Sequence, residues 1–328
     1  MKMKELGEFQ FIDRIKDDCI YAPKHVVVGI GDDGAVYTTT PGAPQIAVID
    51  TMVEGVHFLP ETMSPWQVGY KAVASNLSDI AAMGGIPTHI VLSVAIPPEA
   101  EAEDMEELYQ GIKSICCDFG VNIIGGDTVT SKQGLVITVA AFGELRQGIS
   151  PVTRYGANTG DIIGVTHVLG DSAGGLEVLQ KGIPGYEALK RAHTTPIPQV
   201  LLGELLGQMG ATSMNDISDG LSSELNEIAE ASHKCLHIDR DKIPVSPELE
   251  AWSRETGKPA ADYALFGGED YQLVFTMKPE DFQEAKEMGL EITAIGTVGR
   301  HEPVGVWMRE AGAEKQLLPR GYNHFDKD

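Results

Sequence analysis

The sequence predicts an α/β (α+β) protein with two domains. The chain has 328 residues, which is more than one domain usually holds. Short β-branched runs alternate along it with segments of helical periodicity. Between Arg146 and Gly160 lies a stretch rich in glycine and proline, which is typical of a junction. We therefore expect an N-terminal domain over residues 1–147 and a C-terminal α/β domain over residues 148–328.

Composition and charge narrow the class of protein. With 42% hydrophobic residues, the chain can bury a full core. Its formal charge of −23 argues against nucleic acid or an anionic membrane as a partner, because both attract basic patches. The four cysteines form no C-x-x-C pair, and no stretch resembles a signal peptide or a membrane span. These observations favour a cytoplasmic protein with reduced thiols.

The N-terminal half contains several predicted strands that end in aspartate. A strand over residues 26–28 leads into a glycine-rich turn with Asp32 and Asp33, and a second runs over residues 46–50 and ends at Asp50. An irregular segment over residues 51–59 follows. A third strand, residues 121–124, ends before Gly126 and Asp127. Further strands are expected over residues 88–96 and 135–142, the latter covered on both faces or lying at a subunit contact.

Two helices are predicted between these strands. Ser64, Pro65 and Gln67 form the start signal of the first, because serine and glutamine three residues apart make a capping box. This helix should end at residues 84–85 and carry Asp79 on a fixed scaffold. The second helix, residues 99–119, is acidic in its first turns, as the helix dipole favours.

The C-terminal half also alternates. Strands are predicted over residues 161–166, 212–217, 235–238, 271–276, 292–298 and 304–308. Helices are expected from residue 170, over 198–209, after Asp219, and from about residues 247 and 279. Ser218 or Asp219 is the expected N-cap of the helix that follows them.

Aspartates placed at strand ends and helix starts indicate a divalent-cation site. Each one alone could be a turn former or a cap, and Asp219 is the strongest candidate for a pure cap. Turn formation alone does not explain so many aspartates, because clustered carboxylates repel each other unless a cation lies beside them. Mg²⁺ prefers such oxygen ligands and commonly accompanies phosphates.

The glycine spacing also matches a different motif, which we reject. Gly29, Gly31 and Gly34 fit the dinucleotide-binding fingerprint, and Asp50 follows at the distance of a ribose-binding acid. That motif requires a helix after the third glycine, whereas a strand and a turn follow here. No Walker-type phosphate loop or protein-kinase signature is present either.

Three other positions carry two interpretations each. Glu269 lies in a Gly-Gly-Glu-Asp-Tyr segment that could be a simple turn or a clamp for a cationic ligand. His57 could be a packed loop histidine or a ligand contact. Arg154 could form an interdomain salt bridge or bind a phosphate with its planar guanidinium.

Several blocks of sequence together resemble bacterial thiamine-monophosphate kinases. They run in the same order over about residues 7–325. The blocks are GIGDDGAV (29–36), DTMVEGVHF (50–58), NLSDIAAMG (76–84), GGDT (125–128), SDGL (218–221), GGEDYQL (267–273) and GYNHF (321–325).

The resemblance implies ATP-dependent phosphorylation of thiamine monophosphate to thiamine diphosphate with several Mg²⁺ ions. It also implies an aminoimidazole ribonucleotide synthetase-like fold and a homodimer whose N-terminal domains form a shared sheet or barrel. Carried over by position, the implied metal ligands are Asp33, Asp50, Asp79, Asp127, Asp216 and Asp219. The implied nucleotide contacts are Gly126, Asp127, Arg154 and Ser218, and the implied thiamine-phosphate contacts are His57, Glu269 and Tyr322. Val48 and Ile49 stand where some relatives have hydroxyl residues, so a metal contact there would need a backbone carbonyl.

Direct in-line transfer is the expected mechanism, with Asp216 and Asp219 as the catalytic pair that organises the metal ions. The alternatives within the superfamily are aminoimidazole ribonucleotide synthetase, selenophosphate synthetase and a hydrogenase maturation protein. From another class, the chain could be an acidic protein that binds Mg²⁺ or thiamine phosphates without catalysis.

Overall fold

A computed structural model describes residues 1–300 and 303–321 of the chain. The chain folds as two compact units. Unit 1 comprises Met1–Ile80 and Gly85–Gly148, and unit 2 comprises Ala81–Gly84 and Ile149–Asp328. The four residues 81–84 group with unit 2 because their backbone packs against α7 (Val200–Gln208): a Cβ on Gly203 would lie 2.2 Å from the Ala81 carbonyl oxygen.

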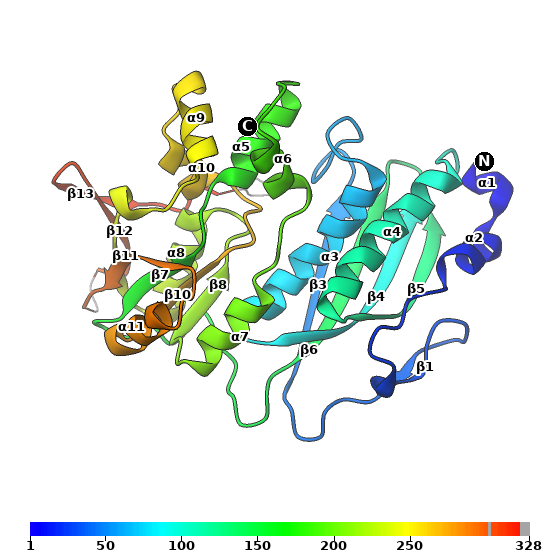
Figure 1. The fold of residues 1–328 in the computed structure, drawn as a ribbon, viewed down its shortest axis with the longest axis horizontal. Coiled ribbons are helices and arrows are strands. Elements are labelled where there is room, and N and C mark those ends of the chain that lie inside the picture. Colours follow the sequence, from blue (N-terminus) through cyan, green and yellow to red (C-terminus); the bar gives the residue numbers. More distant parts are fainter. Residues whose placement is uncertain (301–302, 322–328) are drawn as a thin grey trace. The chain divides into compact units, whose positions relative to one another are not determined.

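Unit 1 is built on a four-stranded sheet with the order β3-β6-β4-β5. Its strands are β3 (Gln45–Val53), β4 (Ile86–Ile96), β5 (Asn122–Thr130) and β6 (Val136–Glu144). Two long helices, α3 (Pro65–Ala82) and α4 (Ala102–Phe119), cover one face (Figure 1). The short elements are α1 (Met3–Leu6), α2 (Glu8–Ile15), the 3₁₀ helix η1 (Pro23–His25), β1 (Val26–Val28) and β2 (Val36–Tyr37).

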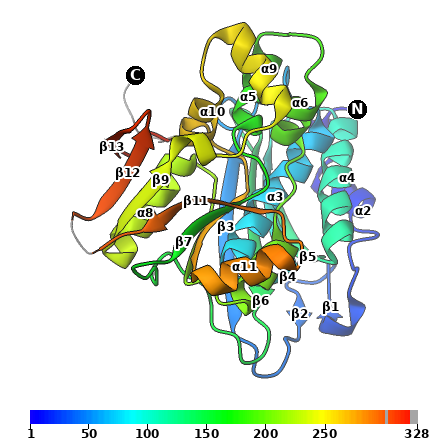
Figure 2. The same cartoon turned by 60° about the vertical axis from the view of Figure 1, so that its left-hand side comes forward.

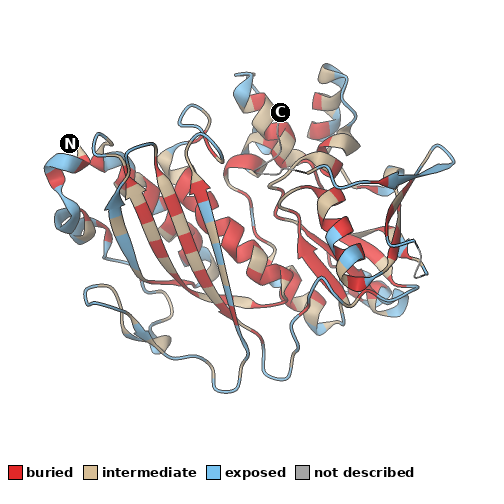
Figure 3. Ribbon diagram, turned by 180° about the vertical axis from the view of Figure 1, so that it is seen from behind, coloured by how far each residue is buried: buried red, intermediate tan, exposed pale blue. Residues whose placement is uncertain are grey.

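The sheet of unit 1 has one buried face and one open face. Along β6, buried residues alternate with partly exposed ones, as expected for a sheet covered on one side. Figure 3 shows the open face from behind, with no helix over it. Of the two environments predicted for this strand, coverage on both faces is therefore wrong for the single chain, and a subunit contact stays a prediction. The sheet is also open at its edges, so the described residues of one chain form no closed barrel.

The predicted start of α3 is confirmed in atomic detail. The Gln67 amide N–H donates to the Ser64 hydroxyl at 3.3 Å, and the Gln67 side chain accepts from the Ser64 N–H at 2.9 Å. These two bonds are the capping box that the sequence indicated. The helix ends at Ala82, and Gly84, with a φ of 74°, follows in the left-handed region that favours glycine.

Two predicted strand ends are wrong. β3 continues through Asp50 to Val53, and β5 continues through Asp127 to Thr130. In β5 Gly126 permits a close approach rather than a turn, since a Cβ on it would lie 2.4 Å from the Leu92 carbonyl oxygen of β4. Both aspartates consequently lie inside strands, where the alternation of side chains decides which face each occupies.

Unit 2 contains a seven-stranded, mostly antiparallel sheet with the order β13-β12-β9-β11-β7-β10-β8. Only the β12–β9 pair is parallel among the described pairs. The strands are β7 (Ile162–Thr166), β8 (Ser213–Asp216), β9 (Cys235–Asp239), β10 (Leu273–Met277), β11 (Ile292–Val298), β12 (Gly305–Glu310) and β13 (Ala313–Leu317). β13 was not predicted, because its sequence Ala-Glu-Lys-Gln-Leu has few strand-forming residues.

Helices of unit 2 form two groups. α8 (Leu221–Ser232) lies along β9 and β12, and its apolar face completes the main core of the unit (Figure 2). A second, smaller core forms among helices that Figure 2 shows gathered at one end of the unit. These helices are α5 (Asp171–Gln180), α6 (Glu187–Thr194), α9 (Pro247–Thr256) and α10 (Ala260–Phe266). The 3₁₀ helix η2 (Arg240–Lys242) and α11 (Pro279–Glu287) complete the unit.

Candidate functional site

Asp50 faces the helical layer of unit 1. It shares this face of β3 with the buried residues Ile46 and Met52. The Ser75 hydroxyl of α3 hydrogen-bonds to its carboxylate, and His57 lies close enough to interact with it electrostatically. Burial nevertheless raises the pKa of Asp50 above its usual value, because these contacts offset only part of the desolvation. A cation beside Asp50 would relieve this cost, so the carboxylate fits the predicted metal role.

The neighbouring turn of α3 supplies more oxygen atoms. Asp79 is half-buried, and Asn76 lies three residues earlier on the same face of the helix. Asn76 is fully buried, and its Oδ1 atom has no hydrogen-bond partner among the described residues. A buried carbonyl-type oxygen is a ligand that Mg²⁺ accepts. The residues around Asp79 therefore suit a divalent cation chemically.

Asp127 lies at the other edge of the sheet from Asp50. The sheet order places β6 and β4 between their strands, a separation of about 14 Å at the usual strand spacing. The register also puts them on opposite faces: Asp127 pairs with Ser93 on the open face, whereas Asp50 faces the helices. Within one chain these two predicted ligands are therefore not brought to the same ion.

The glycine-rich turn over residues 29–34 is exposed. Asp33 donates its backbone N–H to the Asp32 carboxylate at 2.9 Å, so Asp32 acts as a local turn former. The chain then continues into β2, which pairs antiparallel with β1. No helix follows Gly34 here, which confirms the rejection of a dinucleotide-binding fold.

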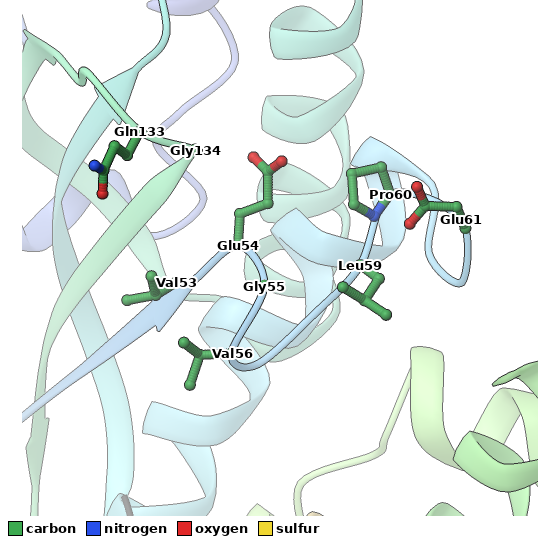
Figure 4. A pocket seen from close by; sticks show the side chains of 9 residues that line it. All are labelled: Val53, Glu54, Gly55, Val56, Leu59, Pro60, Glu61, Gln133 and Gly134. Carbon is green, nitrogen blue, oxygen red and sulfur yellow. The ribbon is translucent and has the colours of Figure 1, made fainter.

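A cavity of about 550 Å³ opens beside the segment that contains His57 (Figure 4). Two carboxylate residues, Glu54 and Glu61, contribute to its lining. Glu54 is held in place because its carboxylate accepts the Leu135 N–H at 2.7 Å. His57 is oriented by its own turn, since its Nδ1 atom accepts the Val53 N–H at 3.0 Å. The cavity has the negative charge that a cationic ring would favour.

In unit 2, Asp216 and Asp219 lie beside a third carboxyl group that the sequence analysis missed. Glu224, on the first turn of α8, is buried and accepts the Asp219 backbone N–H at 3.0 Å. Burial and the charge of Asp216 raise the pKa of Glu224 to about 9. At neutral pH Glu224 is therefore protonated unless a cation lies beside these carboxyl groups. The sequence contained a signal for Glu224, because this acidic residue follows Asp219 by five positions, in the first turn of the helix predicted there.

The predicted N-cap, Ser218 or Asp219, is wrong. The N-cap residue of α8 is Gly220, whose φ of 104° and close contact with the Gly267 carbonyl oxygen exclude a side chain. No side chain caps this helix. The backbone of Asp219 is fixed by Glu224, whose carboxyl accepts its N–H.

Arg154 is held by neighbours within unit 2. Its Nε atom donates to Asn215 Oδ1 at 3.1 Å and lies 3.0 Å from the Glu227 carboxylate. The Asn215 amide in turn donates to Glu224 and Glu227. The Arg154 side chain is 56% exposed, so this network orients a guanidinium that solvent still reaches. Such an arrangement can bind a phosphate.

The segment Gly267–Tyr271, here named the acidic loop, packs backbone to backbone on residues 217–218. Glu269 donates its N–H to the Ser218 carbonyl at 2.6 Å, and Tyr271 donates to Ile217 at 2.9 Å. Gly268 is required, because a Cβ there would lie 2.4 Å from the Ser218 oxygen. The candidate nucleotide contact Ser218 and the candidate acceptor contact Glu269 are therefore adjacent.

The acidic loop is fixed on its other side by Asp270. This carboxyl is buried and accepts the N–H groups of Gly170 and Ser172 at the start of α5. Glu269 and Tyr271 both have left-handed backbone, with φ values of 63° and 50°. Such strain persists only where the surroundings enforce it, and it commonly marks a functional segment.

Some predicted site residues are not assembled by the structure. Tyr322 lies outside the described residues. Across residues 1–300 and 303–321, no three His, Cys, Asp or Glu side chains are grouped as a ready metal site. The six predicted ligands divide between the units, with Asp33, Asp50, Asp79 and Asp127 in unit 1 and Asp216 and Asp219 in unit 2.

Comparisons with known proteins identify the family. The model of the AIR synthase related protein N-terminal domain matches residues 31–145, and that of the C-terminal domain matches residues 158–308. The chain is 37% identical to thiamine-monophosphate kinase of Bacillus subtilis over 98% of this chain and all of that protein. The chain belongs to the thiamine-monophosphate kinase family. The family member of Escherichia coli K12 is 35% identical over 97% of this chain and 98% of its own length.

Solved structures of the family agree. AaThiL complexed with AMPPCP and TMP has a TM-score of 0.79 and 35% identity, and covers 99% of both chains. Thiamine-monophosphate kinase from Stenotrophomonas maltophilia has a TM-score of 0.81 at 34% identity, covering 94% of this chain and 98% of its own. Hydrogenase maturation protein HypE in complex with ATP has a TM-score of 0.75 over 94% of this chain and 93% of its own, but only 19% identity, so that likeness shows the fold alone. These matches confirm the predicted two-part α/β architecture and the predicted family.

Proposed function

We propose that this chain transfers the γ-phosphoryl group of ATP to thiamine monophosphate, forming thiamine diphosphate and ADP. The observation that carries the proposal is its full-length similarity to AaThiL, whose structure holds AMPPCP and TMP. The named relatives across several bacteria support the same reaction. This full-length match at 35% identity favours the kinase over the alternatives of the superfamily, since HypE, a more distant relative, shares only the fold.

The chemistry fits direct in-line transfer. An oxygen of the acceptor phosphate forms the new bond to phosphorus while the bond to the ADP oxygen breaks. The acceptor is already anionic, so the site needs no strong general base. Magnesium ions would supply charge neutralisation, held by Asp33, Asp50, Asp79, Asp127, Asp216 and Asp219. Asp216 and Asp219 act nearest to the transferred group, and a trapped phosphoenzyme would contradict this mechanism.

Nucleotide and acceptor contacts follow the family positions. Gly126, Asp127, Arg154 and Ser218 bind the nucleotide, supported in this chain by the oriented guanidinium of Arg154. His57, Glu269 and Tyr322 bind thiamine phosphate. The carboxylate of Glu269 suits the cationic thiazolium ring electrostatically.

A homodimer would complete the site. In one chain Asp50 and Asp127 lie on opposite edges of the sheet of unit 1. A second copy, packed on the open face, would lie against Asp127, so this proposed nucleotide contact would be at the subunit interface. The open face carries exposed apolar residues that support such packing, among them Ile49 at 66% and Val129 at 45% exposure.

We also propose that the two units act as the functional domains and that the enzyme works in the cytoplasm, where its four free cysteines would stay reduced. No helix in the described part of the chain has the length and apolarity to cross a membrane.

The decisive experiment is an assay with ATP, Mg²⁺ and thiamine monophosphate. Thiamine diphosphate is measured by fluorescence after oxidation to thiochrome. We expect product that depends on both ATP and Mg²⁺. Binding of ATP and thiamine monophosphate without any product or ATP hydrolysis would instead support a binding protein and overturn the proposal.

A further inference from the structure

Glu269 is supported by a histidine that the proposed mechanism does not use. The Glu269 carboxylate lies 3.5 Å from the Nδ1 atom of His193, at the last turn of α6. His193 is only 2% exposed, whereas the Glu269 side chain is 27% exposed. One side of the carboxylate therefore meets a buried imidazole, and the carboxylate also reaches solvent.

The imidazole is itself held by a buried hydroxyl. The Oγ atom of Ser172 lies 3.2 Å from His193 Nδ1. Ser172 is 1% exposed and stands on the first turn of α5, where its N–H donates to Asp270. Ser172 of α5 thus contacts His193, and His193 contacts Glu269. Asp270 of the acidic loop also accepts a hydrogen bond from the first turn of α5.

Rigid support matters here because glutamate is a flexible side chain. An unsupported carboxylate would lose rotamer entropy on binding a ligand. A carboxylate beside Nδ1 favours the tautomer that carries the hydrogen on this nitrogen, so the N–H can be shared between the Glu269 carboxylate and the Ser172 hydroxyl oxygen. A carboxylate placed in advance binds a cation more tightly than a mobile one.

We propose that His193 is a positioning residue that holds the Glu269 carboxylate toward the cationic ring of the acceptor. The inference rests on the proposed function, because it takes Glu269 as an acceptor contact. His193 acts through Glu269 and has no part in the transfer itself. It therefore sets the affinity for thiamine monophosphate and leaves the affinity for ATP unchanged.

Three substitutions separate positioning from packing. His193→Leu keeps much of the volume but removes the donor, and His193→Gln moves the amide to the position of Nε2. His193→Asn keeps a donor close to the position of Nδ1. We expect His193→Leu and His193→Gln to raise the KM for thiamine monophosphate about tenfold. Their kcat and their KM for ATP should stay within about twofold of the values of the unaltered protein. Asn should restore the KM to within about threefold of the original.

A double-mutant cycle tests the route of the effect. In a Glu269→Gln background, His193→Gln should raise the KM by less than about twofold, because the partner carboxylate is gone. His233→Asn, an exposed histidine of the same unit, is the control and should change nothing. Equal effects in both backgrounds, an unchanged KM, or a parallel loss of ATP affinity would overturn the inference. If the unaltered protein forms no thiamine diphosphate, the proposed function fails; if it does and these patterns are absent, only the role of His193 fails.

Discussion

Asp270 illustrates how one buried carboxyl can dominate a local segment. Burial raises its pKa to about 7, although the N–H groups of Gly170 and Ser172 oppose the rise. Between about pH 4 and pH 7 the folded protein binds a proton that the unfolded chain, with an ordinary aspartate pKa, has released. The contribution of Asp270 to stability therefore decreases as the pH rises through this window, and it is constant above it.

Asp270→Asn removes this titration while keeping one acceptor for the α5 amides. We expect the melting temperature of the variant, relative to the original protein, to increase from pH 5 to pH 8. Differential scanning fluorimetry in the presence of a chelator measures this difference. Asp241→Asn, at an exposed aspartate, is the control and should show a constant offset. A constant offset for Asp270→Asn as well would contradict the assigned pKa.

Glu224 is the second residue whose role depends on its surroundings. One oxygen accepts the Asp219 N–H and the other accepts the Asn215 amide. In Glu224→Gln, one of these donors would face an NH₂ group, so the segment with Asp216 and Asp219 should shift. We expect kcat to fall about tenfold or more while the protein stays folded. Glu230→Gln on the exposed side of α8 is the control, and an equal rate for both variants would remove Glu224 from the site.

At the scale of elements, β5 shows why two adjacent glycines differ. A Cβ on Gly126 would lie 2.4 Å from the Leu92 carbonyl oxygen, whereas one on Gly125 would meet only Val91 at an ordinary 3.8 Å. Gly126→Ala must therefore push β5 away from β4, at a cost of about 1–3 kcal/mol in unfolding free energy. Gly125→Ala is the matched control and should cost less than about 1 kcal/mol. Chemical denaturation measures both, and equal losses would contradict the close approach.

At the scale of the whole molecule, the prediction concerns self-association. Ile49 projects from the open face of the unit 1 sheet and is 66% exposed. Ile49→Lys should convert the proposed dimer to a monomer, because a charge would be buried at the interface. Thiamine-monophosphate kinase activity should fall with it, since Asp127, a proposed nucleotide contact, would lose the subunit interface that covers it.

Light scattering coupled to size-exclusion chromatography measures the mass of this variant. Met288→Lys, at a similarly exposed apolar residue that caps the C-terminus of α11, is the control and should keep the original mass. A dimeric Ile49→Lys variant would place the interface elsewhere. A monomeric unaltered protein with full activity would exclude a shared site.

The sequence by itself determined the class of fold, the order of most helices and strands, and the family. Local physical signals sufficed for these: the capping box at Ser64 begins α3, and the residues after Gly34 form a strand rather than a helix. The candidate residues came from linked motifs that are contiguous in sequence. Their individual roles as metal, nucleotide and acceptor contacts stay predictions.

Only the tertiary structure decided how these residues are supported. Asp50 and Asp127 were expected at strand ends, but pairing with neighbouring strands extends β3 and β5 past them and fixes their faces. Gly220 replaced Asp219 as the cap because the backbone of the acidic loop approaches too closely for a side chain. His193 meets Glu269 across a long sequence separation, and no local pattern encodes such a contact. Periodicity and turn chemistry are local properties, whereas register, close approach and burial depend on segments that only folding brings together.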